Sequence, residues 1–99
     1  MHARHILIGV PADASAADRS KARQTAQSVV GQLKRGARFE DIARKLSTDT
    51  GSAQNGGDVG FFPKGQMTPA FEQAAFALKP GQTSGVVETP FGFHVIRTI

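Results

Sequence analysis

Residues 55–67 read Asn-Gly-Gly-Asp-Val-Gly-Phe-Phe-Pro-Lys-Gly-Gln-Met. The Gly pair near the start of this segment favours a turn, the apolar run 59–62 favours a short strand, and Pro63 ends that strand because proline donates no backbone hydrogen bond. The residues just before, 47–54, contain almost no apolar side chain, so residues 47–58 are predicted to form a loop or a single irregular turn. A loop of this length in a compact domain is usually functional.

The part of the chain before this segment predicts one strand and two helices. Residues 3–10 are rich in strand-forming side chains. Ser15 and Asp18 have the spacing of a capping box, and the helix that they begin carries an apolar stripe as far as Gly36. A second short helix is predicted over 39–46, where apolar residues recur at positions i, i+3, i+4 and i+7.

The part after it predicts a helix and a hairpin. Pro69 suits the first turn of a helix whose apolar stripe runs to Leu78. Phe76 lies off this stripe, so the helix is expected to bury two faces, one of them toward a pocket. Residues 84–88 and 93–99 read as two strands joined by a short turn. The order strand, helices, strand, helix, hairpin predicts an α+β fold with one mostly antiparallel sheet covered by helices.

Length and composition fit one domain over residues 1–99. The 99 residues are too few for two domains, and the absence of Cys excludes disulfides and thiolate chemistry. No segment is long and apolar enough to cross a membrane. The formal charge of +4 comes from scattered Lys and Arg without Tyr or Trp beside them, so we expect no nucleic-acid partner. We expect the isolated domain to be a monomer, and it could be part of a longer exported protein.

The segment 55–67, followed by Pro69, Phe71 and residues 76–78, closely resembles the central block of the parvulin-type peptidyl-prolyl cis/trans isomerases, the rotamases, in their bacterial PpiC-like form. A strand with Arg-His-Ile-Leu at 4–7 and a closing Phe-Gly-Phe-His-Val-Ile at 91–96 extend the resemblance over nearly the whole chain. The resemblance implies four strands and four helices. It also implies isomerisation of Xaa-Pro bonds in proline-containing polypeptides, without a cofactor or metal.

The implied reaction needs few chemical groups. Rotation about a peptide C–N bond faces a barrier of about 18 to 20 kcal/mol because twisting breaks the amide resonance. A catalyst therefore needs an apolar slot for the proline ring and fixed polar groups near the carbonyl. The resemblance places Phe62, Met67 and Phe71 around the proline ring, with Val59 and Gln66 beside them; periodicity alone would make the first three ordinary core residues.

Two histidines are candidates for the polar groups. Strand alternation turns His5 and His94 away from the faces of their apolar neighbours. The resemblance places the two imidazoles side by side under the site, where one can donate to the other and onward to the hydroxyl of Thr89. We expect them to hold the shape of the site rather than to transfer a proton; a purely structural role is the alternative.

Asp49 occupies a position where some parvulins carry Cys and many bacterial ones carry Asp. Its carboxylate could repel the substrate carbonyl oxygen from the planar state, or, if protonated, donate within a hydrogen-bond network. The alternative is a role in the turn alone. Ser47 and Ser84 also match the site region of the family.

The loop sequence and the resemblance also give expectations for substrate specificity and cellular compartment. The loop 11–18 holds two acids and no base, so we expect no selectivity for phosphorylated residues before proline and instead a broad specificity. A non-catalytic peptide-binding or chaperone module on the same fold is the alternative function. By resemblance to bacterial folding factors we expect the periplasm or cell surface, with the cytoplasm as the alternative.

Overall fold

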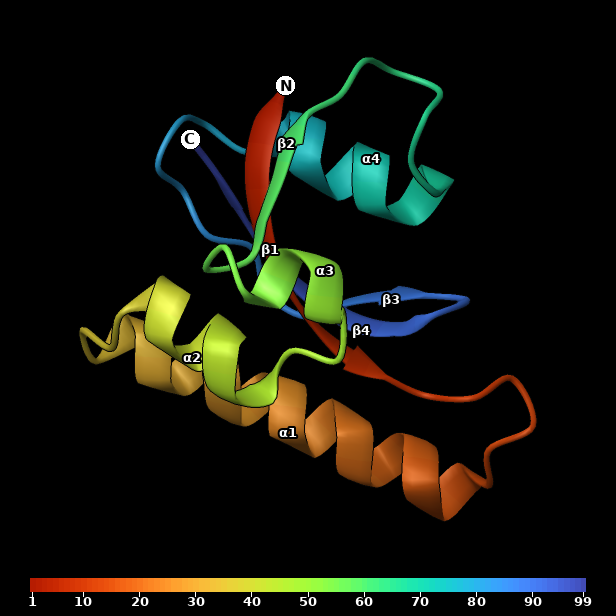
Figure 1. Ribbon diagram of the computed structural model, residues 1–99. Helices are drawn as coiled ribbons and strands as arrows, with labels where there is room; N and C mark the ends of the chain where they lie inside the picture. Colours follow the sequence, from red (N-terminus) through yellow and green to blue (C-terminus); the bar gives the residue numbers. More distant parts are fainter.

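The computed structural model describes residues 1–99. Its elements follow in the order β1 (His2–Gly9), α1 (Ala16–Lys34), α2 (Phe39–Leu46), α3 (Thr50–Ala53), β2 (Asp58–Phe61), α4 (Pro69–Ala77), β3 (Val87–Thr89) and β4 (Gly92–Thr98). The four strands form one sheet in the order β2-β1-β4-β3, and every pairing is antiparallel. The α+β fold with a four-stranded sheet and four helices is therefore confirmed (Figure 1).

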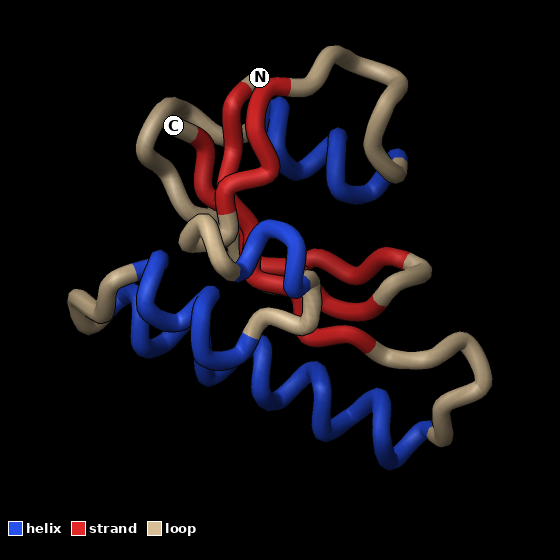
Figure 2. The backbone as a smooth tube through the Cα atoms, viewed as in Figure 1, coloured by secondary structure: helices blue, strands red, loops and turns tan.

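The central strands β1 and β4 divide the interior into two faces. Ile6 pairs with Val95, and both point to the face covered by α1 and α2, where they pack in one buried cluster with Val29 of α1 and Phe39 of α2. The alternate residues of the same strands point to the opposite face, toward α4 (Figures 1 and 2). One face therefore carries a helix-covered core, and the other carries α4 and a cavity.

The helix boundaries follow the predicted signals. The hydroxyl of Ser15 accepts a hydrogen bond from the backbone N–H of Asp18 at 3.1 Å, which caps α1. Gly36 follows α1 with a φ of 97°, the conformation that a glycine after a helix C-terminus provides. Pro69 occupies the first turn of α4, as predicted. Phe76 packs edge-on against Phe62 and lines a cavity, as expected for a side that faces a pocket, but the residue is 36% exposed, so α4 does not bury a second face.

Two segments differ from the prediction in detail. The polar stretch 47–58 contains one helical turn, α3, between two irregular parts. The predicted strand 84–88 is regular only over Val87–Thr89, because Gly85 interrupts it. Ser84 nevertheless stays beside β4, where its N–H donates to the carbonyl of Ile96 at 2.7 Å. No helix combines the length and the hydropathy that a membrane span needs.

Candidate active site

A cavity of about 520 Å³ opens on the α4 face of the sheet, above β1 and β4. Its walls come from these two strands, the segment before α3, the loop between β2 and α4, α4 itself and the β3–β4 turn. The residues that line it are His5, Leu7, Thr48, Asp49, Gln66, Met67, Thr68, Phe71, Phe91 and His94. Six of the residues expected at the site therefore share one cavity: His5, Asp49, Gln66, Met67, Phe71 and His94.

A hydrogen-bond chain runs beneath the cavity floor. His5 Nε2 lies 2.7 Å from Asp49 Oδ2, and His5 Nδ1 lies 3.1 Å from His94 Nδ1. His94 Nε2 lies 2.7 Å from the hydroxyl of Thr89, which in turn accepts from the backbone N–H of Phe91 at 3.2 Å. Both imidazoles and Thr89 are at most 5% exposed, whereas the Asp49 side chain is 37% exposed. Asp49 is thus the most exposed member of this hydrogen-bond chain, and its carboxylate faces the cavity.

Burial sets the charge of the inner imidazole. It lowers the pKa of His94 to about 4, and repulsion from the neighbouring His5 adds to the effect against the attraction of Asp49. His94 is therefore neutral at neutral pH. The neutral state also avoids two adjacent imidazolium ions on one sheet face.

The Asp49 carboxyl is held in its ionised form. Burial alone would raise its pKa, but hydrogen bonds from the Ser52 hydroxyl and from His5, together with attraction to His5, outweigh that effect and lower the pKa. The Ser52 hydroxyl donates to Asp49 Oδ2 at 2.7 Å. Between the two alternatives for Asp49, this geometry favours the carboxylate over a protonated donor.

The contacts with Asp49 set two of the donors. An ionised carboxylate only accepts hydrogen bonds, so His5 Nε2 and the Ser52 hydroxyl both donate to Asp49. Between the two Nδ1 atoms, one imidazole donates to the other, and His94 Nε2 shares a proton with the Thr89 hydroxyl. The network thereby orders Asp49 through its bond to His5.

The segment 47–49 is fastened along β1. The N–H of Thr48 donates to the carbonyl of Leu7 at 2.7 Å, and its hydroxyl accepts from the N–H of Gly9 at 2.9 Å. The hydroxyl of Ser47 accepts from the N–H of Leu7 at 3.1 Å. Ser47 therefore acts on the backbone, and these bonds place Asp49 beside His5 even though the segment has no regular secondary structure.

Apolar side chains form the wall opposite the carboxylate. Phe71 of α4 is buried, and its ring meets the rings of His5 and His94 edge-on, with centroids 5.6 and 5.4 Å apart. Met67 extends from the loop before α4 into the same cavity. Phe62 does not line the cavity; it is 3% exposed and packs behind Phe71, with ring centroids 5.8 Å apart.

The remaining expected residues lie outside the cavity. Val59 is partly buried against the cluster of Phe62 and Phe71. Ser84 is bonded to the backbone of β4 away from the cavity, so the structure gives it a role in sheet pairing. The contacts of Phe62 and Val59 with the proline ring stay predictions, and the structure places both residues one layer behind the wall.

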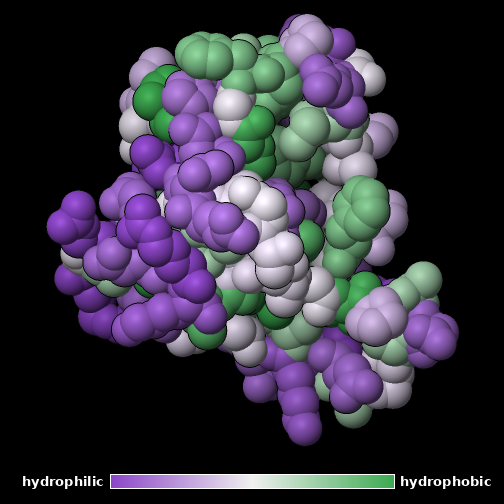
Figure 3. Space-filling view, viewed as in Figure 1, coloured by the Kyte–Doolittle hydropathy of each residue, from purple (hydrophilic) through white to green (hydrophobic).

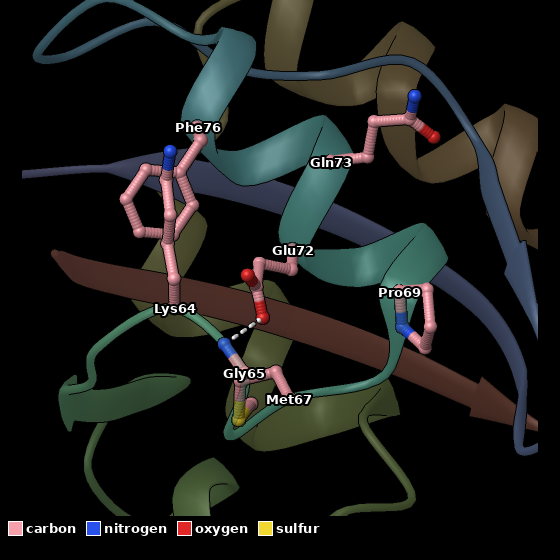
Figure 4. Close-up of a pocket in the computed structure, with 7 residues that line it drawn as sticks. All are labelled: Lys64, Gly65, Met67, Pro69, Glu72, Gln73 and Phe76. Carbon is pink, nitrogen blue, oxygen red and sulfur yellow. Dashed lines mark hydrogen bonds between the residues drawn. The ribbon is translucent and has the colours of Figure 1, made fainter.

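The loop that carries Gln66 and Met67 is held by α4. The N–H of Gly65 donates to Glu72 Oε2 at 2.7 Å, and the ammonium of Lys64 lies over the ring of Phe76, 5.3 Å from its centroid (Figure 4). A second cavity of about 640 Å³ lies between this loop and α4, and Met67 lines both cavities. Glu72 thereby positions the loop that forms one wall of the site.

The sequence interpretation did not expect five of the residues that shape the site. Leu7, Thr48, Thr68 and Phe91 line the cavity, and Ser52 bonds to Asp49. Leu7 lies two positions after His5, so strand alternation alone would have found it. No group of three or more His, Asp or Glu side chains lies together in a way that would hold a metal ion.

A protein-family model and proteins of other organisms match the chain over nearly its whole length. Residues 5–99 match the Rotamase family model, the PPIC-type PPIase domain. The chain is 42% identical over 98 residues to the foldase protein PrsA of Caldanaerobacter subterraneus, covering 99% of this chain and 28% of that protein. The chain spans 21% to 28% of the length of the first three curated relatives that it matches.

Solved structures show the same likeness. The peptidylprolyl isomerase PrsA of Bacillus anthracis superposes with a TM-score of 0.84 at 38% identity, over 98% of this chain and 39% of that one. A structure from Campylobacter jejuni, described with two SurA-like chaperones of which one is a periplasmic protein, gives a TM-score of 0.79 at 33% identity over 97% of this chain and 36% of that one. The chain therefore belongs to the PPIC-type peptidyl-prolyl isomerase family, the parvulin-type rotamases.

Proposed function

We propose that this domain accelerates rotation about Xaa-Pro bonds by binding the proline ring between Met67 and Phe71 and the preceding carbonyl beside Asp49. The observation that carries the proposal is the composition of one cavity: an apolar wall faces a carboxylate that a buried hydrogen-bond chain holds in place. The cavity between α4 and the loop before it also combines apolar side chains with a carboxylate, that of Glu72, but Glu72 bonds to the exposed backbone N–H of Gly65 and not to a buried hydrogen-bond chain. The reaction needs no cofactor, because it breaks only amide resonance.

The mechanism follows from the polarity of the amide. The planar amide places partial negative charge on its oxygen, and twisting about the C–N bond removes that resonance. A fixed carboxylate near the oxygen raises the free energy of the planar state more than that of the twisted state. Asp49 supplies this charge, and Met67 and Phe71 exclude water that would otherwise solvate the planar amide. His5, His94 and Thr89 position Asp49 and do not exchange protons with the substrate.

The preferred substrates are flexible, unphosphorylated polypeptides. No Lys or Arg lines the cavity, and its charged group is the ionised Asp49. A phosphate before the proline would bring a dianion toward this carboxylate without a basic partner. Phosphorylated Ser-Pro or Thr-Pro segments are therefore disfavoured.

The longer proteins to which the chain is similar suggest its setting. They are called a foldase and chaperones, and one is described as periplasmic. We propose that this domain works on unfolded chains in the same kind of setting, in the periplasm or at the cell surface, as one part of a folding factor. Catalysis and chaperone-type holding are compatible in such a protein.

Exchange NMR on the peptides Ala-Leu-Pro-Phe and Ala-pSer-Pro-Phe tests the proposal. Uncatalysed exchange takes tens to hundreds of seconds, so catalysis is read directly from cis/trans exchange peaks. We expect acceleration of the unphosphorylated peptide and a loss of about tenfold or more in Asp49→Asn, which keeps the size of the side chain and removes its charge. Peptide binding without accelerated exchange would leave a non-catalytic chaperone module instead.

A further inference from the structure

A second cavity adjoins the candidate active site at Met67. It has a volume of about 640 Å³ and lies between α4 and the loop that precedes this helix. Met67 lines both cavities, whereas Asp49 lines only the first. The second cavity therefore continues the active-site cavity beyond its apolar wall, without reaching the carboxylate.

Phe76 gives the second cavity an apolar surface. Its ring packs edge-on against Phe62, with centroids 6.2 Å apart, yet the residue is 36% exposed. Pro69 and Met67 line the same cavity, so three apolar side chains border it (Figure 4). Lys64 lies over the Phe76 ring, but Lys64 is exposed, and an exposed cation–π contact is weak enough for an apolar ligand to replace it. Hydrophobic side chains gather over β2 and α4 in the space-filling view, whereas the α1–α2 part is mostly hydrophilic (Figure 3).

The loop that borders the second cavity is held in one shape. The N–H of Gly65 donates to Glu72 Oε2 at 2.7 Å, and Gly65 has a φ of 90°, which a residue with a side chain rarely adopts. Pro69 follows in the first turn of α4 and restricts the other end of the loop. A ligand that enters the cavity therefore meets a preformed surface and does not have to order the loop.

The function proposed above sets the direction of a bound chain, and the inference rests on it. With the carbonyl before the proline beside Asp49 and the proline ring against Met67 and Phe71, the chain after the proline leaves past Met67. An extended chain advances about 3.3 Å per residue, so the next one or two residues reach the second cavity. We propose that this cavity binds a large apolar side chain from the first two residues after the proline. Its burial against Phe76 and Met67 selects substrates that carry such a residue there.

The test compares kcat/KM from exchange NMR for three end-blocked peptides that differ only after the proline: Ala-Leu-Pro-Ala-Ala, Ala-Leu-Pro-Phe-Ala and Ala-Leu-Pro-Ala-Phe. In the wild type we expect the better of the two Phe peptides to exceed the Ala-Ala peptide by about tenfold, and in Phe76→Ala this ratio should fall to about threefold or less. Phe76→Leu keeps an apolar side chain and should give an intermediate ratio. The matched control is Phe61→Ala on β2, which removes a ring that is 80% exposed and lines neither cavity. Its ratio should equal that of the wild type.

The outcomes separate a failure of this subsite from a failure of catalysis. Equal kcat/KM for the three peptides in the wild type would refute the subsite and leave the isomerase function intact. An unchanged ratio in folded Phe76→Ala would also refute it. If no peptide is accelerated, the proposed function falls, and dissociation constants from NMR titration judge the subsite: tighter binding of a Phe peptide that Phe76→Ala weakens supports it, and equal binding of all three peptides refutes it.

Discussion

Asp49 is the residue at which a buried network meets the cavity. His5 and Ser52 bond to its carboxylate, His94 and Thr89 continue the hydrogen-bond chain behind His5, and Asp49 alone among them is substantially exposed. Such a network holds the negative charge of Asp49 in one position. In the proposed mechanism, His5 and His94 position Asp49 and do not donate a proton to the substrate.

The neutral state of His94 predicts how stability depends on pH. Folding lowers its pKa from 6.5 to about 4. Between these values the unfolded chain binds a proton that the folded chain does not, so stability falls as the pH falls from about 6.5 to about 4. The loss approaches roughly 3 kcal/mol at the lower end. Asp49, whose pKa is lowered from 3.8, also stabilises the folded state in its ionised form. That stabilisation is lost mainly below a pH of about 4, outside the range in which His94 acts.

Urea unfolding at several pH values between 7 and 4 measures how the free energy of unfolding changes with pH. In His94→Gln the titrating group is absent, so the variant should lose less stability across the window than the wild type, even if it is less stable at pH 7. If the free energy of unfolding falls equally with pH in the wild type and in His94→Gln, His94 is not the group responsible for the pH dependence.

At the residue scale, the sequence predicted which polar residues lie together better than it predicted their individual contacts. His5, Asp49, His94 and Thr89 were all expected together, and the structure joins them in one chain. Ser52 was not expected, because its bond to Asp49 depends on the helical turn α3 within a polar stretch that carries no periodic signal.

At the level of the elements, the Gly-Gly-Asp sequence at 56–58 forms a tight turn that connects the polar segment to β2 and bonds to β1. Gly57 has a φ of 89°, its carbonyl accepts from the N–H of His5 at 2.8 Å, and a Cβ on it would lie 2.5 Å from the carbonyl oxygen of His5. Asp58 accepts from the N–H of Gly60 and from His2. This turn therefore brings the end of the polar segment against β1 beside His5.

Gly57→Ala should destabilise the domain by about 2 to 4 kcal/mol, because it adds a backbone clash to the strain of positive φ. Gly81→Ala is the matched control: its φ is 81°, and a Cβ there would meet nothing within 4 Å. It should cost about 1 kcal/mol. Urea unfolding checks both; equal losses would show that the close approach to His5 contributes nothing.

Element boundaries were predictable where local signals are strong. The cap at Ser15, the glycine at 36 and the proline at 69 each lie where the prediction places them. The predicted strand 84–88 is longer than β3, and the prediction for 47–58 did not choose between a loop and a single turn such as α3. The extent of β3 and the presence of α3 depend on tertiary hydrogen bonds rather than on propensity.

At the scale of the whole molecule, the two faces of the sheet carry different structures. One face packs Ile6 and Val95 against α1 and α2, and the other combines a buried cluster under α4 with the cavity that the two histidines line. The two chain ends lie close together at one end of the molecule (Figure 1). This placement suits a domain inserted within longer proteins, of which the chain spans about a quarter in its matched relatives. That residues 1–99 form a single domain, and that the isolated domain is a monomer, stay predictions.

The central claim is that isomerisation takes place in the cavity above the histidine pair. Exchange NMR on Ala-Leu-Pro-Phe with wild type, Met67→Ala and Ile99→Ala tests it most directly, since Met67 lines the cavity and Ile99 is a half-exposed apolar residue outside it. We expect Met67→Ala to lose about tenfold in kcat/KM, within the range for one hydrophobic contact group, and Ile99→Ala to match the wild type. A folded Met67→Ala domain that accelerates exchange as fast as the wild type would show that isomerisation does not take place in this cavity.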